Sequence, residues 1–165
     1  MLIYLLRHGI AEDGGNGMRD EDRALTDEGW KKLRRSTAAW REVVEPPQVV
    51  FSSPLRRARE TASVLVEALG GPAELRIDDA LVPSAPPALA MSLLEAEQHS
   101  GTGSVAVVGH EPHLGYLLGL LLTGHPRQPI PLKKGMLVAV ETESAASLIA
   151  SLRFALSQRA AGALQ

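Results

Sequence analysis

The chain has 165 residues, of which 45% are hydrophobic and 22% charged, and its formal net charge is −2 at pH 7. The length predicts a single domain over residues 1–165, and the small net charge provides no basic field for a nucleic-acid partner. The lack of cysteine excludes disulfides and thiolate metal sites. The apolar runs are shorter than the ~20 residues of a membrane-spanning helix, and the N-terminus does not resemble a signal peptide, so we expect a cytoplasmic protein without a membrane segment.

Apolar runs alternate with amphipathic stretches along the chain, a pattern typical of an α/β fold. In chain order, the predicted strands cover 1–6, 48–51, 74–77, 104–108, 136–141 and 148–154. The predicted helices cover 26–44, 54–69, 86–97 and 112–122. Thr26 is the expected N-cap of the first helix, and prolines open the other three at positions 54, 86 and 112. We therefore predict a three-layer α/β/α fold, in which helices flank a mostly parallel sheet that ends in an antiparallel pair of strands.

Two segments lie outside this pattern. Residues 10–23 form a long polar loop with three glycines and five acidic side chains, and we interpret it as a solvated lid or spacer. Its acids do not have the spacing of a calcium-binding loop. Residues 157–165 are weakly patterned and are predicted to be a flexible tail.

Cation-capable side chains follow three of the predicted parallel strands. Arg7 and His8 come after the first strand, Arg56 and Arg57 after the second, and His110 after the fourth. Carboxyl ends of parallel strands share one edge of a sheet, where ligands bind. Two of these turns also begin helices, whose N-termini attract anions. The sequence therefore predicts a phosphoryl-binding pocket, although the residues alone do not choose between Arg56 and Arg57.

A neutral imidazole is a competent nucleophile toward phosphorus, so one histidine can attack while the other steadies an oxygen. His8 is the better candidate, because Gly9 beside it leaves space for a phosphate. His110 and His113 are three residues apart, but Pro112 lies between them and no third ligand is evident, so we predict neither a metal nor a cofactor. For His113 we favour a surface or capping role over a place at the pocket rim.

Four motifs carry a resemblance to a known family. They are Leu6-Arg7-His8-Gly9, Leu25-Thr26-Asp27-Glu28-Gly29, Ser53-Pro54-Leu55-Arg56-Arg57-Ala58-Arg59-Glu60-Thr61 and Gly109-His110-Glu111-Pro112. In order and spacing they resemble the histidine phosphatase superfamily, the phosphoglycerate-mutase-like proteins, and imply that fold. The resemblance implies a phospho-enzyme mechanism, with His8 as nucleophile, Arg7 and Arg57 as phosphate clamps and His110 as a second, charged histidine.

The family register also bears on the neighbouring positions. The family's arginine lies four residues after the serine and precedes an alanine, which selects Arg57 and leaves Arg56 solvated. Ser53 and Thr61 match family positions, and we interpret them first as a helix cap and a packing residue.

Many family members supply a carboxylic acid that protonates an alkoxide leaving group. In this chain the corresponding stretch is Leu81-Val82-Pro83-Ser84, which has no acid, and Asp78 and Asp79 precede it at a predicted solvated strand end. A phosphohistidine needs less help, because its other ring nitrogen can carry a proton and let neutral imidazole depart. The short chain and the missing acid resemble the SixA-type protein-histidine phosphatases of this superfamily.

The resemblance thus implies a metal-independent phosphatase whose substrate is a phosphohistidine-containing protein, such as a phosphotransfer or phosphocarrier domain. Two alternatives stay open. One is a small-molecule phosphomonoesterase that uses Glu12, Asp78 or Asp79 as its acid, and the other is a non-catalytic phosphate-binding module. The sequence leaves open the oligomeric state and whether loop 10–23 closes over a substrate.

Overall fold

The structure, a computed structural model, describes residues 1–15, 17–70, 74–144 and 146–163. Its centre is a six-stranded sheet with the order β3-β2-β4-β1-β5-β6. The strands are β1 (Leu2–Arg7), β2 (Val49–Ser52), β3 (Glu74–Ile77), β4 (Ser104–Gly109), β5 (Leu137–Ser144) and β6 (Ser147–Leu156). Strands β3, β2, β4 and β1 are parallel, whereas β5 and β6 join antiparallel. The predicted mostly parallel sheet with an antiparallel pair is confirmed.

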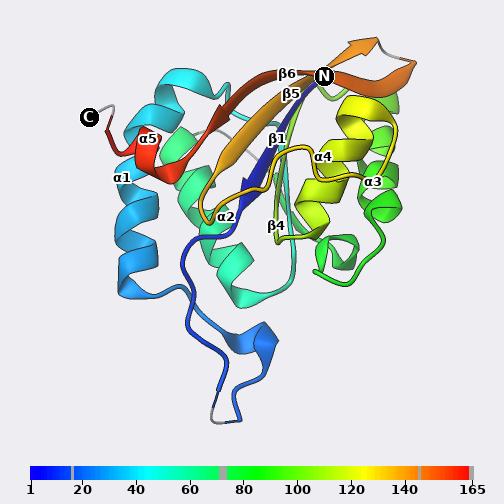
Figure 1. Cartoon of the computed structure of the whole chain (residues 1–165). Helices are drawn as coiled ribbons and strands as arrows, with labels where there is room; N and C mark the ends of the chain where they lie inside the picture. Colours follow the sequence, from blue (N-terminus) through cyan, green and yellow to red (C-terminus); the bar gives the residue numbers. More distant parts are fainter. Residues whose placement is uncertain (16, 71–73, 145, 164–165) are drawn as a thin grey trace.

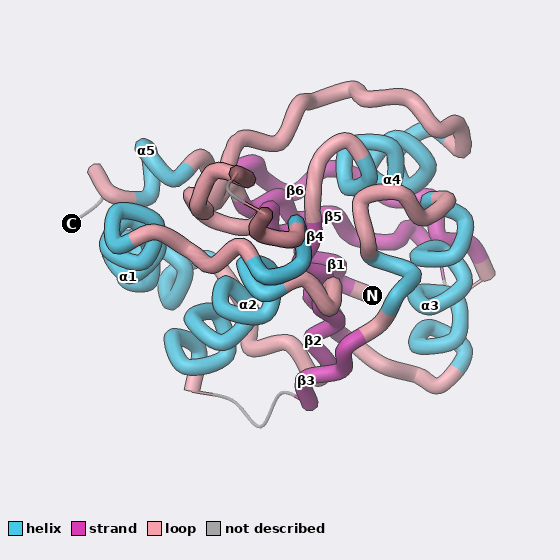
Figure 2. The backbone as a smooth tube through the Cα atoms, turned by 90° about the horizontal axis from the view of Figure 1, so that it is seen from below, coloured by secondary structure: helices cyan, strands magenta, loops and turns pink. Residues whose placement is uncertain are grey.

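Helices cover both faces of this sheet. They are α1 (Asp27–Val43), α2 (Arg56–Leu69), α3 (Pro87–His99), α4 (His113–Thr123) and α5 (Gln158–Ala161), with single 3₁₀ turns η1 (Asp20–Asp22) and η2 (Asp79–Leu81). In Figure 1, α1 and α2 lie on one side of the strands and α3 and α4 on the other. Figure 2, viewed from below, shows the same three layers. Within the described ranges, no helix has the length and apolar character needed to cross a bilayer.

Alternation along each strand separates the core into two halves. Ile3 and Leu5 of β1 pack in the half beneath α3 and α4, whereas Tyr4 and Leu6 pack in the half beneath α1 and α2. Because both faces of β1 are covered, its four buried residues form one continuous apolar run in the sequence. The continuous run at the N-terminus therefore marks a central strand, and it delivers Arg7 to the carboxyl edge of the sheet.

The helix starts differ from the predictions in detail. α1 begins as predicted, with Thr26 Oγ1 accepting a hydrogen bond from Gly29 N at 3.0 Å. α2 begins at Arg56 rather than at Pro54, because Leu55 O is the first carbonyl to accept a helical bond. Pro86 and Pro112 occupy N-cap positions, one residue before the first helical position.

The tail includes an element that the sequence did not indicate. Ser157 Oγ accepts a hydrogen bond from Ala160 N at 3.2 Å and so caps α5. Ala161 is buried, and α5 packs against α1. Residues 164 and 165 of the predicted flexible tail lie outside the described part of the chain.

Candidate active site

The register of two neighbouring strands sets the two histidines side by side. In the parallel pair β1 and β4, Arg7 lies opposite Gly109. The next residue on each strand is a histidine, so His8 and His110 leave the sheet at the same level. His8 N donates to Gly109 O at 3.0 Å, and the two imidazole rings have their centroids 5.0 Å apart.

His8 is buried and held in a neutral form. Its Nδ1 lies 2.7 Å from Gly9 O, a group that only accepts, so this nitrogen carries the proton and Nε2 keeps its lone pair. Burial lowers the pKa of His8 to about 4, and the charges of Arg57, Arg7 and Lys134 act in the same direction against the hydrogen bond to Gly9. At neutral pH the ring is therefore uncharged, with a lone pair on Nε2.

His110 is buried and contacts a serine. Its Nε2 lies 2.8 Å from Ser53 Oγ, and its Nδ1 has no hydrogen-bond partner among the described residues. Burial lowers the pKa of His110 to about 2, and a proton on His8 and the charge of Arg57 act in the same direction. The resemblance implies a charged second histidine, whereas burial favours the neutral form of His110. A phosphate dianion is the group that would favour the charged form there.

The two arginines approach the histidines from different elements. Arg7 ends β1 and donates from Nη1 to Leu132 O at 2.7 Å. Arg57, in the first turn of α2, is only 4% exposed, whereas Arg56 is exposed and pairs with Glu60 at 2.8 Å along the helix. The structure thus brings Arg7, His8, Arg57 and His110 together and leaves Arg56 outside the pocket.

An acidic side chain that the sequence did not indicate forms an ion pair with Arg57. Asp20, in η1 of the loop 10–23, accepts from Arg57 Nη1 at its carbonyl (2.6 Å) and from Nη2 at Oδ2 (2.9 Å). Burial raises the pKa of Asp20, but the hydrogen bonds and charges of Arg57 and Arg23 outweigh this effect, and the net shift is downward. A carboxylate therefore lies on the arginine that would bind a phosphate oxygen. The only sequence signal was the clustering of acids in that loop.

Ser53 and Thr61 have larger roles than the helix cap and packing residue we predicted. Ser53 Oγ accepts from Leu55 N at 3.3 Å and also contacts His110. Thr61 Oγ1 accepts from Gly9 N at 3.1 Å and donates to Arg57 O at 2.7 Å. Thr61 of α2 and Ser53, just before this helix, thereby contact the two histidine-bearing turns.

Gly9 also has a packing role. A Cβ at this position would come within 2.8 Å of Leu33 Cδ1 and 3.2 Å of Leu25 Cδ2. The glycine thus lets the turn after His8 pack closely against α1, while room for a phosphate beside it stays a prediction.

Two of the three candidate acids are hydrogen-bonded to backbone amides. Glu12 accepts from Ala24 N at 2.9 Å, and Asp78 accepts from Ala80 N at 2.8 Å as the cap of η2. Asp79 is exposed. Glu111, next to His110, uses its two oxygens on Leu132 N (2.8 Å) and Gln128 Nε2 (2.9 Å), so it fixes the loop that contacts Arg7.

His113 is 1% exposed at the start of α4, so the expected surface or capping role is wrong. Its side chain turns into the core because the helix begins there with its apolar face toward the sheet. Burial lowers the pKa of His113 against a smaller effect of the Ala80 backbone. Within the described residues, no three histidine, aspartate or glutamate side chains are grouped so as to hold a metal ion.

Comparison with known proteins gives matches along most of the chain. The family model of the histidine phosphatase superfamily (branch 1) matches residues 3–82. Phosphohistidine phosphatase SixA of Escherichia coli is 31% identical over 126 residues, which cover 75% of this chain and 76% of that protein. An uncharacterised protein of Picosynechococcus sp. is 28% identical over 145 residues, covering 88% of this chain and 87% of that protein.

Solved structures give the same picture. The protein histidine phosphatase SixA complexed with tungstate has a TM-score of 0.84 and 26% identity, with coverage of 96% of this chain and 98% of that one. A mycobacterial glucosyl-3-phosphoglycerate phosphatase shares the fold, with a TM-score of 0.73, 19% identity and coverage of 93% and 97%.

Proposed function

The chain belongs to the histidine phosphatase superfamily, and from this premise we propose that it hydrolyses phosphohistidine in proteins through a covalent intermediate on His8. The likeness to phosphohistidine phosphatase SixA in sequence and in fold supports the substrate class. The proposal includes independence of metal ions and of any cofactor, and the cytoplasmic location expected from the sequence.

In the first step, the lone pair of His8 Nε2 attacks the phosphorus atom and forms a new P–N bond. Arg7 and Arg57 bind the phosphoryl oxygens, and Arg57 exchanges its contact with Asp20 for one with phosphate. The P–N bond of the substrate breaks, and its imidazole departs neutral because its other ring nitrogen carries a proton. His110, hydrogen-bonded to Ser53, lies where it can donate to a phosphoryl oxygen once the dianion raises its pKa.

In the second step, water attacks the phosphorus atom of phospho-His8. The P–N bond breaks, Nε2 recovers its lone pair and inorganic phosphate is released. This bond is chemically the same as the bond broken in the first step. A pocket that completes the second step therefore already has what it needs to release an imidazole.

The observation that carries the choice of substrate is the position of the candidate acids. Glu12 and Asp78 are hydrogen-bonded to backbone amides and Asp79 is exposed, so none is placed to protonate an alkoxide. Asp20 is in the pocket, but its lowered pKa keeps it ionised. General acid catalysis contributes about 10²–10⁴-fold to a reaction that needs it. Alkyl phosphates are therefore poor substrates for this pocket.

The test compares kcat/KM for a phosphohistidine protein, an aryl phosphate and glycerol phosphate, each with and without chelator. We expect the first two to be hydrolysed and glycerol phosphate to be nearly inert, with no effect of chelator. Glu12→Gln, Asp78→Asn and Asp79→Asn should change the phosphohistidine rate by less than about tenfold. Fast alkyl-ester cleavage that collapses in one of these variants would instead indicate a small-molecule phosphomonoesterase. No turnover of any substrate, with phosphate binding intact, would indicate a phosphate-binding module.

A further inference from the structure

A groove of about 850 Å³ opens beside Arg7, on the side of the molecule formed by α1 and α5. Six basic side chains line it, and none of the lining residues, all within the described part of the chain, is acidic. The six are Arg7, Lys32, Arg35, Lys133, Lys134 and Arg159. The whole chain has a net charge of −2, so this concentration of positive charge is a local feature and not a reflection of overall composition.

Hydrogen bonds attach one wall of the groove to the end of β1. Gly135 N donates to both Arg7 O and His8 O at 3.1 Å, so Lys133 and Lys134 are held directly beside the end of β1. Lys134 is near enough for its charge to lower the pKa of His8. The groove is therefore continuous with the candidate active site.

The short α5 forms the outer wall. Gly135 has φ +67°, a conformation that favours glycine, and a Cβ there would come within 2.4 Å of the Gln158 side chain. This close approach seats α5 on the turn that bears the two lysines, while α5 also packs against α1. Arg159 of α5 and Arg35 of α1 consequently face the same space.

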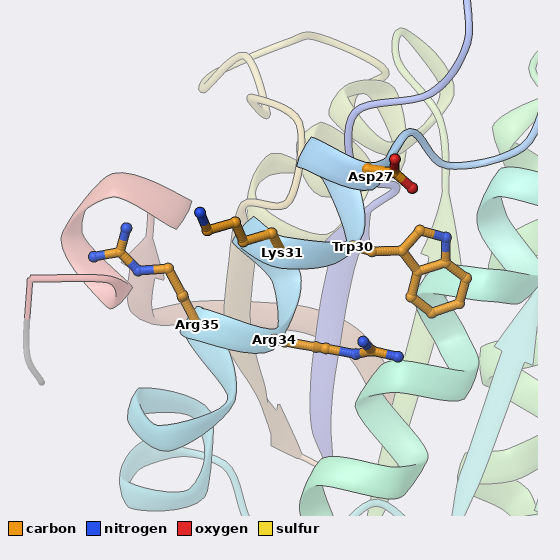
Figure 3. Close-up of a pocket in the computed structure, with 5 residues that line it drawn as sticks. All are labelled: Asp27, Trp30, Lys31, Arg34 and Arg35. Carbon is orange, nitrogen blue, oxygen red and sulfur yellow. The ribbon is translucent and has the colours of Figure 1, made fainter.

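Neighbouring residues of α1 differ in direction. Figure 3 shows Arg35 on the side of α1 that faces α5, whereas Arg34 points to the opposite side, together with Trp30. Arg34 lies 5.4 Å from the Trp30 ring centroid. Lys32 pairs with Glu28 at 2.6 Å, so part of its charge is already balanced. The other basic side chains of the groove come from α1, the turn at 133–134 and α5, with Arg7 at its inner end.

We propose that this groove docks an acidic surface of the phosphoprotein substrate, next to the phosphohistidine that enters the pocket. The inference rests on the proposed function and adds the charge of the partner. One phosphoryl group is already matched by Arg7 and Arg57, so the further cations on three separate segments fit an anionic surface wider than a single phosphate. Clustered charge of one sign raises the rate of encounter with a complementary partner about 10- to 1,000-fold.

The test uses two substrates. One is a histidine-phosphorylated four-helix phosphotransfer domain with acidic side chains around its histidine, and the other is free phosphohistidine. The double variant Lys133→Glu/Arg159→Glu should lose about tenfold or more in kcat/KM on the phosphoprotein, mainly through KM, and less than about twofold on free phosphohistidine. Arg35→Glu should act in the same direction and Arg34→Glu, its matched control, should not. The dependence of kcat/KM on salt should flatten in the groove variants.

A second form of the phosphoprotein, with its acidic side chains changed to amides, completes the design. The native enzyme should have a low kcat/KM on this form. The groove variants should lower that kcat/KM little further. Equal losses on both substrates, or no loss on either, would overturn the docking inference while leaving the proposed function intact. Failure of the native protein to release phosphate from any phosphohistidine would overturn the proposed function itself.

Discussion

His8 and His110 are both buried, and burial disfavours a charged imidazole. Each ring also has the other as a neighbour, so a proton on one opposes a proton on the other. The consequence for chemistry is a pair of neutral rings, and His8 keeps a lone pair on Nε2. The arriving phosphate brings the negative charge that makes a protonated His110 favourable.

The nucleophile assignment predicts a trapped intermediate. Rapid mixing of the native protein with substrate, followed by quenching, should leave phosphate on His8 that is stable to base and labile to acid. His8→Ala should lack both this species and turnover, because it removes the imidazole nitrogen that forms the bond to phosphorus. Mass spectrometry of the quenched protein locates the group, and phosphate on a serine or aspartate would contradict the assignment.

Arg57 and Arg56 are adjacent but should differ sharply on substitution. Arg57→Ala removes a buried donor of charge-assisted hydrogen bonds and should lower kcat by about 10²–10³-fold. Arg56→Ala removes one exposed ion pair with Glu60 and should change kcat less than about twofold. Steady-state kinetics on both variants check this, and comparable losses would mean that the wrong arginine has been placed in the pocket.

At the scale of elements, the ends of the strands were predictable. Arg7, His8 and His110 follow apolar runs directly, and parallel strands end at one edge, so their convergence follows from the sequence. The helix that carries Arg57 was also found, but choosing this residue over Arg56 required the family register. Direction around a helix axis depends on where the helix begins, and Pro54 suggested a start two residues too early.

The missed features depend on contacts between distant segments. Asp20 meets Arg57 across 37 residues of sequence, and nothing in the loop 10–23 indicates which of its acids reaches the pocket. Thr61 meets Gly9 across 52 residues. α5 has too few residues for a helical pattern, and packing against α1 rather than propensity maintains it.

The loop 10–23 is predicted to compete with bound anions through Asp20. Asp20→Asn removes the negative charge that lies next to Arg57. Inorganic phosphate and tungstate should therefore inhibit several-fold more strongly, with inhibition constants lowered by about tenfold or less. Inhibition constants measured at pH 7 test this. Asp22→Asn is the matched control, since Asp22 pairs with Arg19 and not with Arg57. Unchanged inhibition by both anions in Asp20→Asn would show that the carboxylate does not compete.

At the scale of the whole molecule, the two histidines make stability depend on pH. The pKa of an unfolded histidine is about 6.5, whereas burial lowers the pKa of His8 to about 4 and that of His110 to about 2. At pH values between the folded and the unfolded pKa of each histidine, the unfolded chain binds more protons than the folded chain. Stability is therefore complete above about pH 6.5 and falls as the pH drops below it.

Each of these histidines should lower the free energy of unfolding by about 2 kcal/mol between pH 7 and pH 5. Urea unfolding at the two pH values measures the loss for the native protein. His8→Asn should show a smaller loss than the native protein, while His125→Asn, at an exposed loop position, should match it. An equal loss in His8→Asn would mean that His8 titrates normally in the folded state.

The order of the strands has a further consequence for how the protein is made. β4 lies between β1 and β2, although it follows both in sequence by more than fifty residues. During synthesis on a ribosome, the two earlier strands therefore emerge without the strand that joins them, and their apolar side chains stay uncovered until residue 109 has left the exit tunnel. A nascent chain that has reached the end of α2 already contains Arg7, His8 and Arg57 but has no sheet to hold them. β4 joins β1 to β2 and delivers His110, so the four side chains of the candidate site can come together only after this strand has emerged.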